Sequence, residues 1–349
     1  MKEKKHKAEL EYINGIHVAG SILWLDSPRL AELCFMSHAL LKPGGPHRKL
    51  ILSERTNQLM EKPPGGRILA VPFFRRFSVG ALVLQLVPSG YLPGAAQLLI
   101  ERDGQRMVYS SDFCLLERIT AERAQPQPAE VLILRTQLPP DLVFPDPGQV
   151  QAHLLGWAES MGQKGRTALL LFDEAAAALE LVALLRTHGF AVHLHREFFA
   201  LAWRALKIGV PLQGVHRHRS EQTRPAVLVW PWRLRQSPAL RRLEAVSAMA
   251  VGPAAACPGA ASRLGVDEAV CFTQFPDRQQ VETYLEWAKP AKVYLTGRSS
   301  PQWSAHLQGR GLRVALLAPP QQLSLFDKLE VVEENELNML GSGHVSGGS

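Results

Sequence analysis

The sequence predicts an α/β protein with two regions, and three observations carry this prediction. Residues 21–134 contain short apolar runs separated by Pro and Gly turns, which is typical of β-strands. Residues 149–230 alternate helical and strand-like patterns, which is typical of the βαβ units of a parallel sheet. The length of 349 residues exceeds what one hydrophobic core usually organises, so two domains or one domain with a large insertion are expected.

The first region is expected to be mostly sheet. Asp103-Gly104 lies between two apolar runs and predicts a hairpin, because a type I′ turn needs positive φ at both central residues. The expected strands cover residues 21–25, 33–37, 49–53, 67–71, 81–87, 96–102, 105–110 and 131–134.

The second region follows a proline-rich connection, and a second domain is expected to start near residue 141. Its apolar spacing alternates between the helical and the strand period. Glycine and serine dominate residues 341–349, which predicts a flexible tail. The expected strands cover 167–172, 191–195, 226–230, 292–296 and 313–317, and the expected helices 149–161, 173–188, 198–207 and 303–308.

The composition indicates a globular, cytoplasmic protein. Hydrophobic residues make up 46% and charged residues 20%, which argues against wholesale disorder. No apolar run reaches the roughly 18 residues of a membrane span, and the lysine-rich start leads into no apolar signal core, so no membrane partner is expected. Cys34, Cys114, Cys257 and Cys271 form no CxxC pair, which favours free thiols over a zinc ribbon.

The charge balance permits a nucleic-acid partner. The net charge is +7 and the pI is about 9.4. Such a balance attracts polyanions, although many basic proteins bind no nucleic acid. The second half concentrates the positive charge in residues 216–219, Arg233, Arg235, Arg241 and Arg242.

A segment near the start resembles a family of nucleases. Residues 15–39 contain Gly-Ile-His-Val-Ala-Gly-Ser-Ile-Leu-Trp-Leu-Asp and then Leu-Cys-Phe-Met-Ser-His-Ala. This resembles the opening of the β-CASP branch of the metallo-β-lactamase-fold nucleases, in which a His-x-His-x-Asp-His loop supplies several ligands to two zinc ions. His38 fills the first position of that loop. Leu40, Lys42 and Pro43 stand where the resemblance implies a histidine, an aspartate and a histidine.

Later segments continue the resemblance in family order, over residues 15–318. Residues 88–97 are similar to the family's Gly-His-x-x-Gly-Ser-Ala motif, and residues 108–113 are similar to its Ser-Gly-Asp motif. In the second of these, Asp112 retains the carboxylate that bridges the metals in the family. The remaining ligand positions are replaced by Tyr91 for a histidine, Arg135 for an acidic residue, Phe275 for a histidine and Gly297 for the last histidine.

The resemblance implies a metallo-β-lactamase-like αββα sandwich with an inserted β-CASP-like parallel α/β domain. It assigns residues 1–140 and 291–326 to the sandwich, 141–290 to the insert and 327–349 to the tail.

His38 and Asp112 are the metal positions that remain, and a catalytic zinc needs three protein ligands. We therefore expect no catalytic residue and no resident metal. Two alternatives stay open: both residues are ordinary loop residues, or His17, His47 or Cys34 helps to rebuild a zinc or manganese site.

A short motif precedes the tail. Gln322, Leu323, Leu325 and Phe326 resemble the peptide with which bacterial repair and replication proteins bind the sliding clamp. Two adjacent apolar side chains at a chain end suit a partner's groove. The alternative is that Leu325 and Phe326 cap the core of the domain.

Aromatic and basic residues alternate after the strand expected at 226–230. Trp230, Trp232, Arg233 and Arg235 are candidate nucleic-acid ligands, because aromatic rings with interleaved arginines suit unstacked bases. The alternative is that the two tryptophans pack in the core.

Other motifs exclude some function classes. His193 and His195 have ligand-like spacing, but in an alternating strand such a pair more often faces solvent. No Gly-x-x-x-x-Gly-Lys-Ser/Thr loop and no Gly-x-Ser-x-Gly elbow is present, so nucleotide hydrolysis and serine esterase chemistry lack motif support.

Three functional hypotheses follow. The first is a catalytically silent nuclease homologue that serves as a DNA-repair scaffold, binding nucleic acid (DNA favoured), the sliding clamp, and an active nuclease, ligase or helicase. The second is an active metal-dependent DNA exonuclease or RNA nuclease with a reduced metal site. The third is a related fold with an unrelated small-molecule or protein-binding role, which salt-dependent nucleic-acid binding would exclude.

Overall fold

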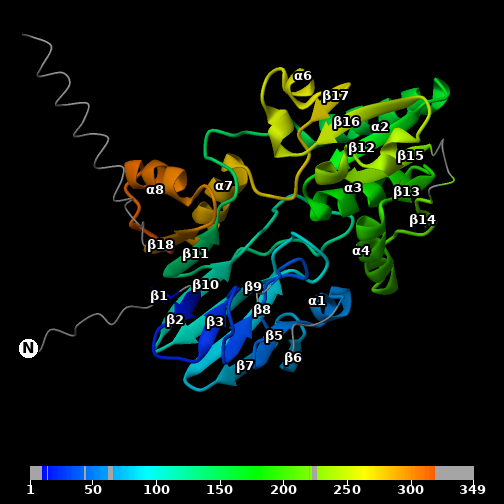
Figure 1. Cartoon of the computed structure of the whole chain (residues 1–349). Coiled ribbons are helices and arrows are strands. Elements are labelled where there is room, and N and C mark those ends of the chain that lie inside the picture. Colours follow the sequence, from blue (N-terminus) through cyan, green and yellow to red (C-terminus); the bar gives the residue numbers. More distant parts are fainter. Residues whose placement is uncertain are drawn as a thin grey trace, which may run out of the picture. The chain divides into compact units, whose positions relative to one another are not determined.

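The structure is a computed structural model and describes residues 10–13, 15–42, 45–61, 66–219, 221 and 226–318. This part of the chain is mixed α/β, as the sequence predicts, and its strands form three sheets (Figure 1). No helix within the described ranges is long and apolar enough to cross a bilayer.

The first sheet contains β1 (Leu10–Tyr12), β2 (Ile16–Val18), β3 (Leu23–Leu25), β4 (Leu33–Phe35), β5 (Lys49–Ser53) and β6 (Arg67–Val71), in that order. It is antiparallel from β1 to β3 and parallel from β3 to β6. Helix α1 (Glu54–Leu59) follows β5 directly. Ser53 caps this helix, because its hydroxyl accepts the backbone N–H of Thr56 at 3.0 Å.

The second sheet contains β7 (Arg76–Val79), β8 (Leu82–Pro88), β9 (Ala96–Arg102), β10 (Gln105–Ser110), β11 (Val131–Arg135), β18 (Lys292–Thr296) and β19 (Val314–Leu316). Their spatial order is β19-β18-β11-β10-β9-β8-β7. The predicted hairpin joins β9 to β10, with φ of 52° at Asp103 and 79° at Gly104. The chain leaves this sheet after β11 and returns at β18, which pairs with β11 in parallel.

The first and second sheets share one core. Leu84 and Leu98 of the second sheet and Leu23 and Phe35 of the first belong to the same buried cluster. The other face of the second sheet packs against α7 (Arg278–Ala288) and α8 (Ser300–Gly309). The first sheet, the second sheet and the layer of helices α7 and α8 therefore stack in that order.

The third sheet is entirely parallel, in the order β14-β13-β15-β12-β16-β17. It contains β12 (Thr167–Phe172), β13 (Val192–Leu194), β14 (Val215–Arg217), β15 (Val227–Pro231), β16 (Val246–Val251) and β17 (Glu268–Val270). The helices that belong with it are α2 (Pro147–Gln163), α3 (Ala175–Thr187), α4 (Arg196–Lys207), α5 (Pro238–Arg241) and α6 (Ala260–Leu264).

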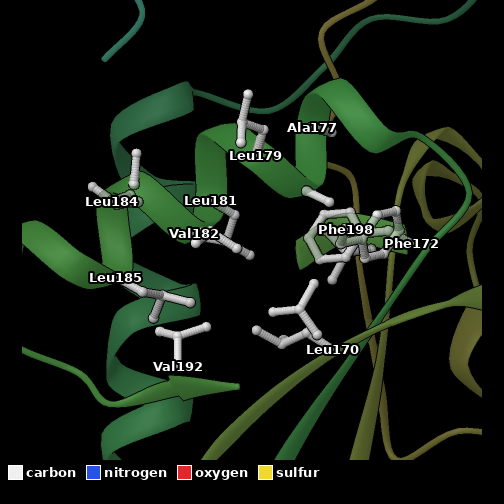
Figure 2. Close-up of a cluster of buried hydrophobic side chains, with 14 of the residues drawn as sticks. Leu170, Phe172, Ala177, Leu179, Leu181, Val182, Leu184, Leu185, Val192 and Phe198 are labelled. Atoms are coloured by element: carbon white, nitrogen blue, oxygen red, sulfur yellow. The ribbon is translucent and has the colours of Figure 1, made fainter. Parts of the chain in front are cut away.

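Helix α3 covers this sheet through an apolar face. Figure 2 shows Leu181, Val182 and Leu185 of α3 lying against Leu170 of β12 and Val192 of β13. All six residues of β12 are buried. A strand with both faces covered needs a continuous apolar run rather than alternation, which explains the sequence of β12.

The sequence predicted elements with long apolar runs better than short elements. Six strands have the predicted bounds, namely β5, β6, β9, β10, β12 and β18. The prediction missed β1, β2, β7, β14, β16, β17, α1, α5, α6 and α7. Several of these strands have three residues, too few for a two-residue period to stand out.

Helix α7 departs from the predicted domain division. Its residues fall within the predicted insert, but Tyr284 and Leu285 pack on the second sheet. The predicted boundaries at residues 140 and 291 themselves stay a prediction.

Candidate functional site

The candidate site lies where strands of the first two sheets end. His38 follows β4, Asp112 follows β10, and Arg135 is the last residue of β11. Strands β10 and β11 run in parallel, with Ser110 beside Leu134, so their carboxyl ends meet at one edge. This register brings Asp112 next to Arg135.

Two nitrogen atoms, one from Arg135 and one from His38, lie close to the same carboxylate oxygen of Asp112. Nη1 of Arg135 donates a hydrogen bond to Oδ2 of Asp112 at 3.2 Å. Nε2 of His38 lies 3.3 Å from the same oxygen, outside hydrogen-bond geometry. His38 and Asp112 are each 4% exposed, so water screens these contacts little.

The ring of His38 is oriented against metal binding. Its Nδ1 accepts the backbone N–H of Leu40 at 3.3 Å. A neutral imidazole that accepts at Nδ1 carries its proton on Nε2. A histidine that binds a metal through Nε2 has the opposite arrangement, with Nδ1–H donating to a neighbouring acceptor. His38 therefore presents an N–H to Asp112 rather than a lone pair to a cation.

Asp112 is held as a carboxylate. Burial alone would raise its pKa, but the contact with His38 and the charge of Arg135 lower the pKa below its ordinary value. Arg135 is held in turn by Gln137, whose amide oxygen, in the orientation that satisfies both groups, accepts from Nε and Nη2 at 2.8 Å each. The guanidinium of Arg135 thus compensates the negative charge of the Asp112 carboxylate.

Apolar and aromatic side chains occupy three further positions that the resemblance assigns to ligands, namely Leu40, Tyr91 and Phe275. The ring of Tyr91 stacks on Phe275, with centroids 5.6 Å apart, and meets His38 edge-on at 5.0 Å. Leu40 packs against the same hydrophobic cluster. These groups bury the site, since Tyr91 is 4% exposed.

Gly297 has no room for a side chain. Its φ is +99°, and a Cβ added there would lie 2.6 Å from the backbone oxygen of Thr136. A histidine at this position would force the backbone at Gly297 and the backbone at Thr136 apart. The backbone at Gly297 therefore leaves no room for the last histidine that the resemblance implies.

The residues present do not fit a two-zinc centre. No group of three or more His, Cys, Asp and Glu that could hold a metal occurs among the described residues. His17 contacts Glu11 and the backbone oxygen of Ser21, and Nδ1 of His47 accepts the N–H of Ala31. Burial, with a smaller effect from the nearby Asp26 carboxylate, raises the pKa of the Cys34 thiol to about 12, which disfavours a thiolate.

Asp26 forms a second polar centre that the sequence analysis did not identify. Its carboxylate accepts the N–H and hydroxyl of Ser37 at 2.7 and 2.6 Å and the hydroxyl of Tyr109 at 2.8 Å. A cavity of about 300 Å³ lies beside it and is also lined by Lys42 and Arg135. The positive φ of 42° at Asp26, at the turn after β3, is a local signal of its special role.

Glu174 is a further buried carboxyl group close to the site. Its two oxygens accept the hydroxyl of Thr273 at 2.6 Å and the N–H of Gln274 at 3.1 and 3.2 Å. Burial raises the pKa of Glu174 to about 7, in spite of these donors, and the Asp112 charge adds to the increase. The available sequence signal was the pair of acidic residues Asp173 and Glu174 after the buried strand β12.

The predicted nucleic-acid residues have different environments. Trp230 is 4% exposed, and its indole N–H donates to the backbone oxygen of Leu234 at 3.2 Å. This placement favours the packing alternative and corrects the prediction of base stacking for Trp230. Trp232 is partly buried, with the guanidinium of Arg235 4.4 Å above its ring, and Arg233 pairs with Glu197.

The motif of Gln322, Leu323, Leu325 and Phe326 lies outside the described residues, as does the predicted tail at 327–349. Pro43 also lies outside them.

Comparison with known proteins gives distant similarities. No model of a known protein family matches the chain. A protein named "Probable DNA ligase" from Opitutus terrae is 23% identical over 322 residues, which are 91% of this chain and 32% of that protein. An uncharacterized protein from Synechocystis sp. is 29% identical over 186 residues, 46% of this chain and 33% of that protein. The chain thus spans about a third of the length of these curated relatives.

Among solved structures, the fold is similar to that of a protein of unknown function from Enterococcus faecalis. The TM-score is 0.52 with 12% identity, and the match covers 77% of this chain and 76% of the other. At this identity the likeness concerns the fold alone.

Proposed function

We propose that this chain is a catalytically silent member of the metallo-β-lactamase-fold β-CASP nucleases, with the αββα sandwich and parallel insert of that family. It serves as a nucleic-acid-binding partner in DNA processing. The observation that carries the proposal is the guanidinium of Arg135, which lies 3.2 Å from the carboxylate oxygen of Asp112. A fixed cation at this point repels a metal ion and replaces the charge that the metal would supply.

One distant relative supports a link to DNA. The protein named "Probable DNA ligase" contains, in one chain, a segment similar to 91% of this chain, and this segment is 32% of its length. A segment of this kind inside a protein with that name suits a chain that acts together with a ligase on DNA. We therefore favour DNA over RNA, and a DNA ligase over a nuclease or helicase, as the partner of this chain.

The test is metal analysis and a nuclease assay on the purified protein. We expect less than one equivalent of zinc and no degradation of single- or double-stranded DNA with Zn²⁺ or Mn²⁺. Leu40→His should restore neither, because Gly297 and Arg135 still block the site. Stoichiometric zinc together with an activity that Asp112→Ala abolishes would favour the metal-dependent nuclease instead.

We also propose that Gln322 to Phe326 docks the chain on a bacterial sliding clamp. The support is the motif itself, which follows the last strand of the second sheet at Leu316 by a few residues. Such a peptide would hold the protein at a site of DNA synthesis while its folded body binds nucleic acid.

A further inference from the structure

One edge of the third sheet carries several basic side chains. Strand β14 is the edge strand, and His216 and Arg217 on it are exposed. His216 lies beside His193 of β13, with ring centroids 5.5 Å apart. Arg219 follows the strand. In a parallel sheet, ligands usually bind at the carboxyl ends of the strands.

Helix α4 presents an aromatic row next to this edge. Phe199, Trp203 and Lys207 are four residues apart, so they lie along one side of the helix. The rings of Phe199 and Trp203 are nearly parallel, with centroids 6.3 Å apart, and Nζ of Lys207 lies 5.5 Å from the Trp203 ring. Trp203 is 48% exposed, while Phe198, Leu201 and Ala202 on the opposite side are buried in the core.

A hollow lies between Phe199, the first residue of the aromatic row, and the basic edge. Its volume is about 1040 Å³, and its lining includes Phe199, His216, Arg217, His218 and Arg219. Glu221 is the acidic residue among its lining side chains. The two arginines therefore outnumber the one carboxylate of this lining, and the ring of Phe199 adjoins them.

We propose that this α4–β14 surface, made of Phe199, Trp203, Lys207, His216, Arg217 and Arg219, binds single-stranded nucleic acid without sequence preference. The inference deepens the proposed function and rests on it. Bases stack on Trp203, displacing the Lys207 ammonium, which then pairs with a phosphate together with Arg217 and Arg219. Unpaired bases are required, because the faces of paired bases are covered by their neighbours in a duplex.

A metal site is a poorer explanation of the histidines. Two imidazoles face each other at His193 and His216, but no group of three ligands forms among the described residues. Among the described residues, Nδ1 of His218 is buried and has no hydrogen-bond partner. His218 instead meets the buried Trp230 edge-on, with centroids 5.7 Å apart.

Stacking is tested by fluorescence anisotropy with labelled oligodeoxythymidine and oligouridine of equal length. Trp203→Ala should weaken binding about tenfold, and Trp203→Phe should keep most of the affinity. The matched control is Trp287→Ala, which removes an indole that is 59% exposed on α7, and it should bind like the wild type. Equal melting temperatures of the variants check that the fold is retained.

Phosphate contacts are tested by the salt dependence of the same binding. Lys207→Gln and Arg217→Gln should each reduce the slope of log K against log salt by about 0.7. Arg263→Gln, which removes an exposed arginine on α6, is the control and should leave the slope unchanged.

The outcomes separate this surface from the proposed function. If the wild type binds with steep salt dependence and the Trp203 and Arg217 variants bind equally well, the surface is elsewhere and this inference is wrong, while the proposed function stands. If the wild type binds neither probe, both fail. Binding that falls in the Trp203 and Arg217 variants but not in the controls supports the surface, and the tighter probe identifies the preferred sugar.

Discussion

Arg135 and Asp112 form a buried charge pair in a position that the resemblance assigns to metal ions. Arg135 is 30% exposed at its side chain and Asp112 5%, so the pair is only partly accessible to water. Removing one partner of such a pair leaves the other charge without compensation, which costs more than the pair itself contributes. The pair is therefore expected to matter for stability rather than for catalysis.

The first prediction at this scale is a double-mutant cycle on that pair. Arg135→Leu should lower the free energy of unfolding by about 2–3 kcal/mol at pH 7, because Asp112 stays charged and buried. Adding Asp112→Asn should recover part of the loss, measured by urea unfolding. Arg278→Ala removes the half-exposed partner of Glu282 and should cost far less. Additive effects at Arg135 and Asp112 would show that they do not interact.

The second prediction concerns Glu174. The pKa of its carboxyl group is about 7 in the folded protein against an ordinary 4.5, so the folded state retains a proton that the unfolded chain releases. The contribution of Glu174 to the free energy of unfolding is fully present below pH 4.5 and is lost as the pH rises through 7. Glu174→Gln removes this loss, so the stability of the variant relative to wild type should rise by about 3 kcal/mol between pH 4 and pH 8.

Urea unfolding at a series of pH values measures this difference. Glu159→Gln on the exposed side of α2 serves as the control for removing one carboxylate. A difference between Glu174→Gln and wild type that does not change with pH would contradict the assignment.

At the scale of elements, the end of β15 decides what the tryptophans do. The last residues of β15 are buried, and Trp230 packs among Leu169, Leu171 and Leu228. The rings of His195 and His218 lie against it, with centroids 4.4 and 5.7 Å from that of Trp230. Trp232 follows in a short 3-10 turn and is only partly buried.

The third prediction follows from this difference. Trp230→Ala should lower the free energy of unfolding by about 3–5 kcal/mol, because it leaves a large cavity under β15. Trp232→Ala should cost clearly less, and both effects are read from thermal or urea unfolding. A Trp230→Ala protein with normal stability but weak nucleic-acid binding would restore the stacking alternative.

At the scale of the whole molecule, the proposed function combines a catalytically silent site with two binding functions, one for nucleic acid and one for the sliding clamp. The α4–β14 surface belongs to the third sheet, whereas the Arg135–Asp112 pair belongs to the second. Substitutions in one are thus expected to leave the other unchanged.

The fourth prediction concerns the clamp motif. Leu325→Ala with Phe326→Ala should abolish binding to a bacterial sliding clamp, for which micromolar affinity is expected because few side chains are buried. The melting temperature and the affinity for nucleic acid should stay nearly unchanged. Surface plasmon resonance and thermal unfolding measure these effects. A melting temperature lower by many degrees would place the pair in the core.

The sequence alone determined the α/β class, the strands with long apolar runs and the β9–β10 hairpin. Each depends on local rules: periodicity, a buried run such as Thr167–Phe172, or the positive φ that Asp103-Gly104 accepts. It also showed that Leu40, Arg135 and Gly297 are not metal ligands, because ligand chemistry is a property of the residue type.

Only the tertiary structure decided how the positions that the resemblance assigns to ligands are used. Arg135 and Asp112 are 23 residues apart, and Glu174 and Gln274 100, so only strand pairing and chain return bring them together. The lack of space at Gly297 and the burial of Trp230 likewise depend on residues that are distant in the sequence. The tautomer of His38 follows from the backbone path between His38 and Leu40. Sequence periodicity carries local information, whereas charge compensation and exposure arise from contacts between remote segments.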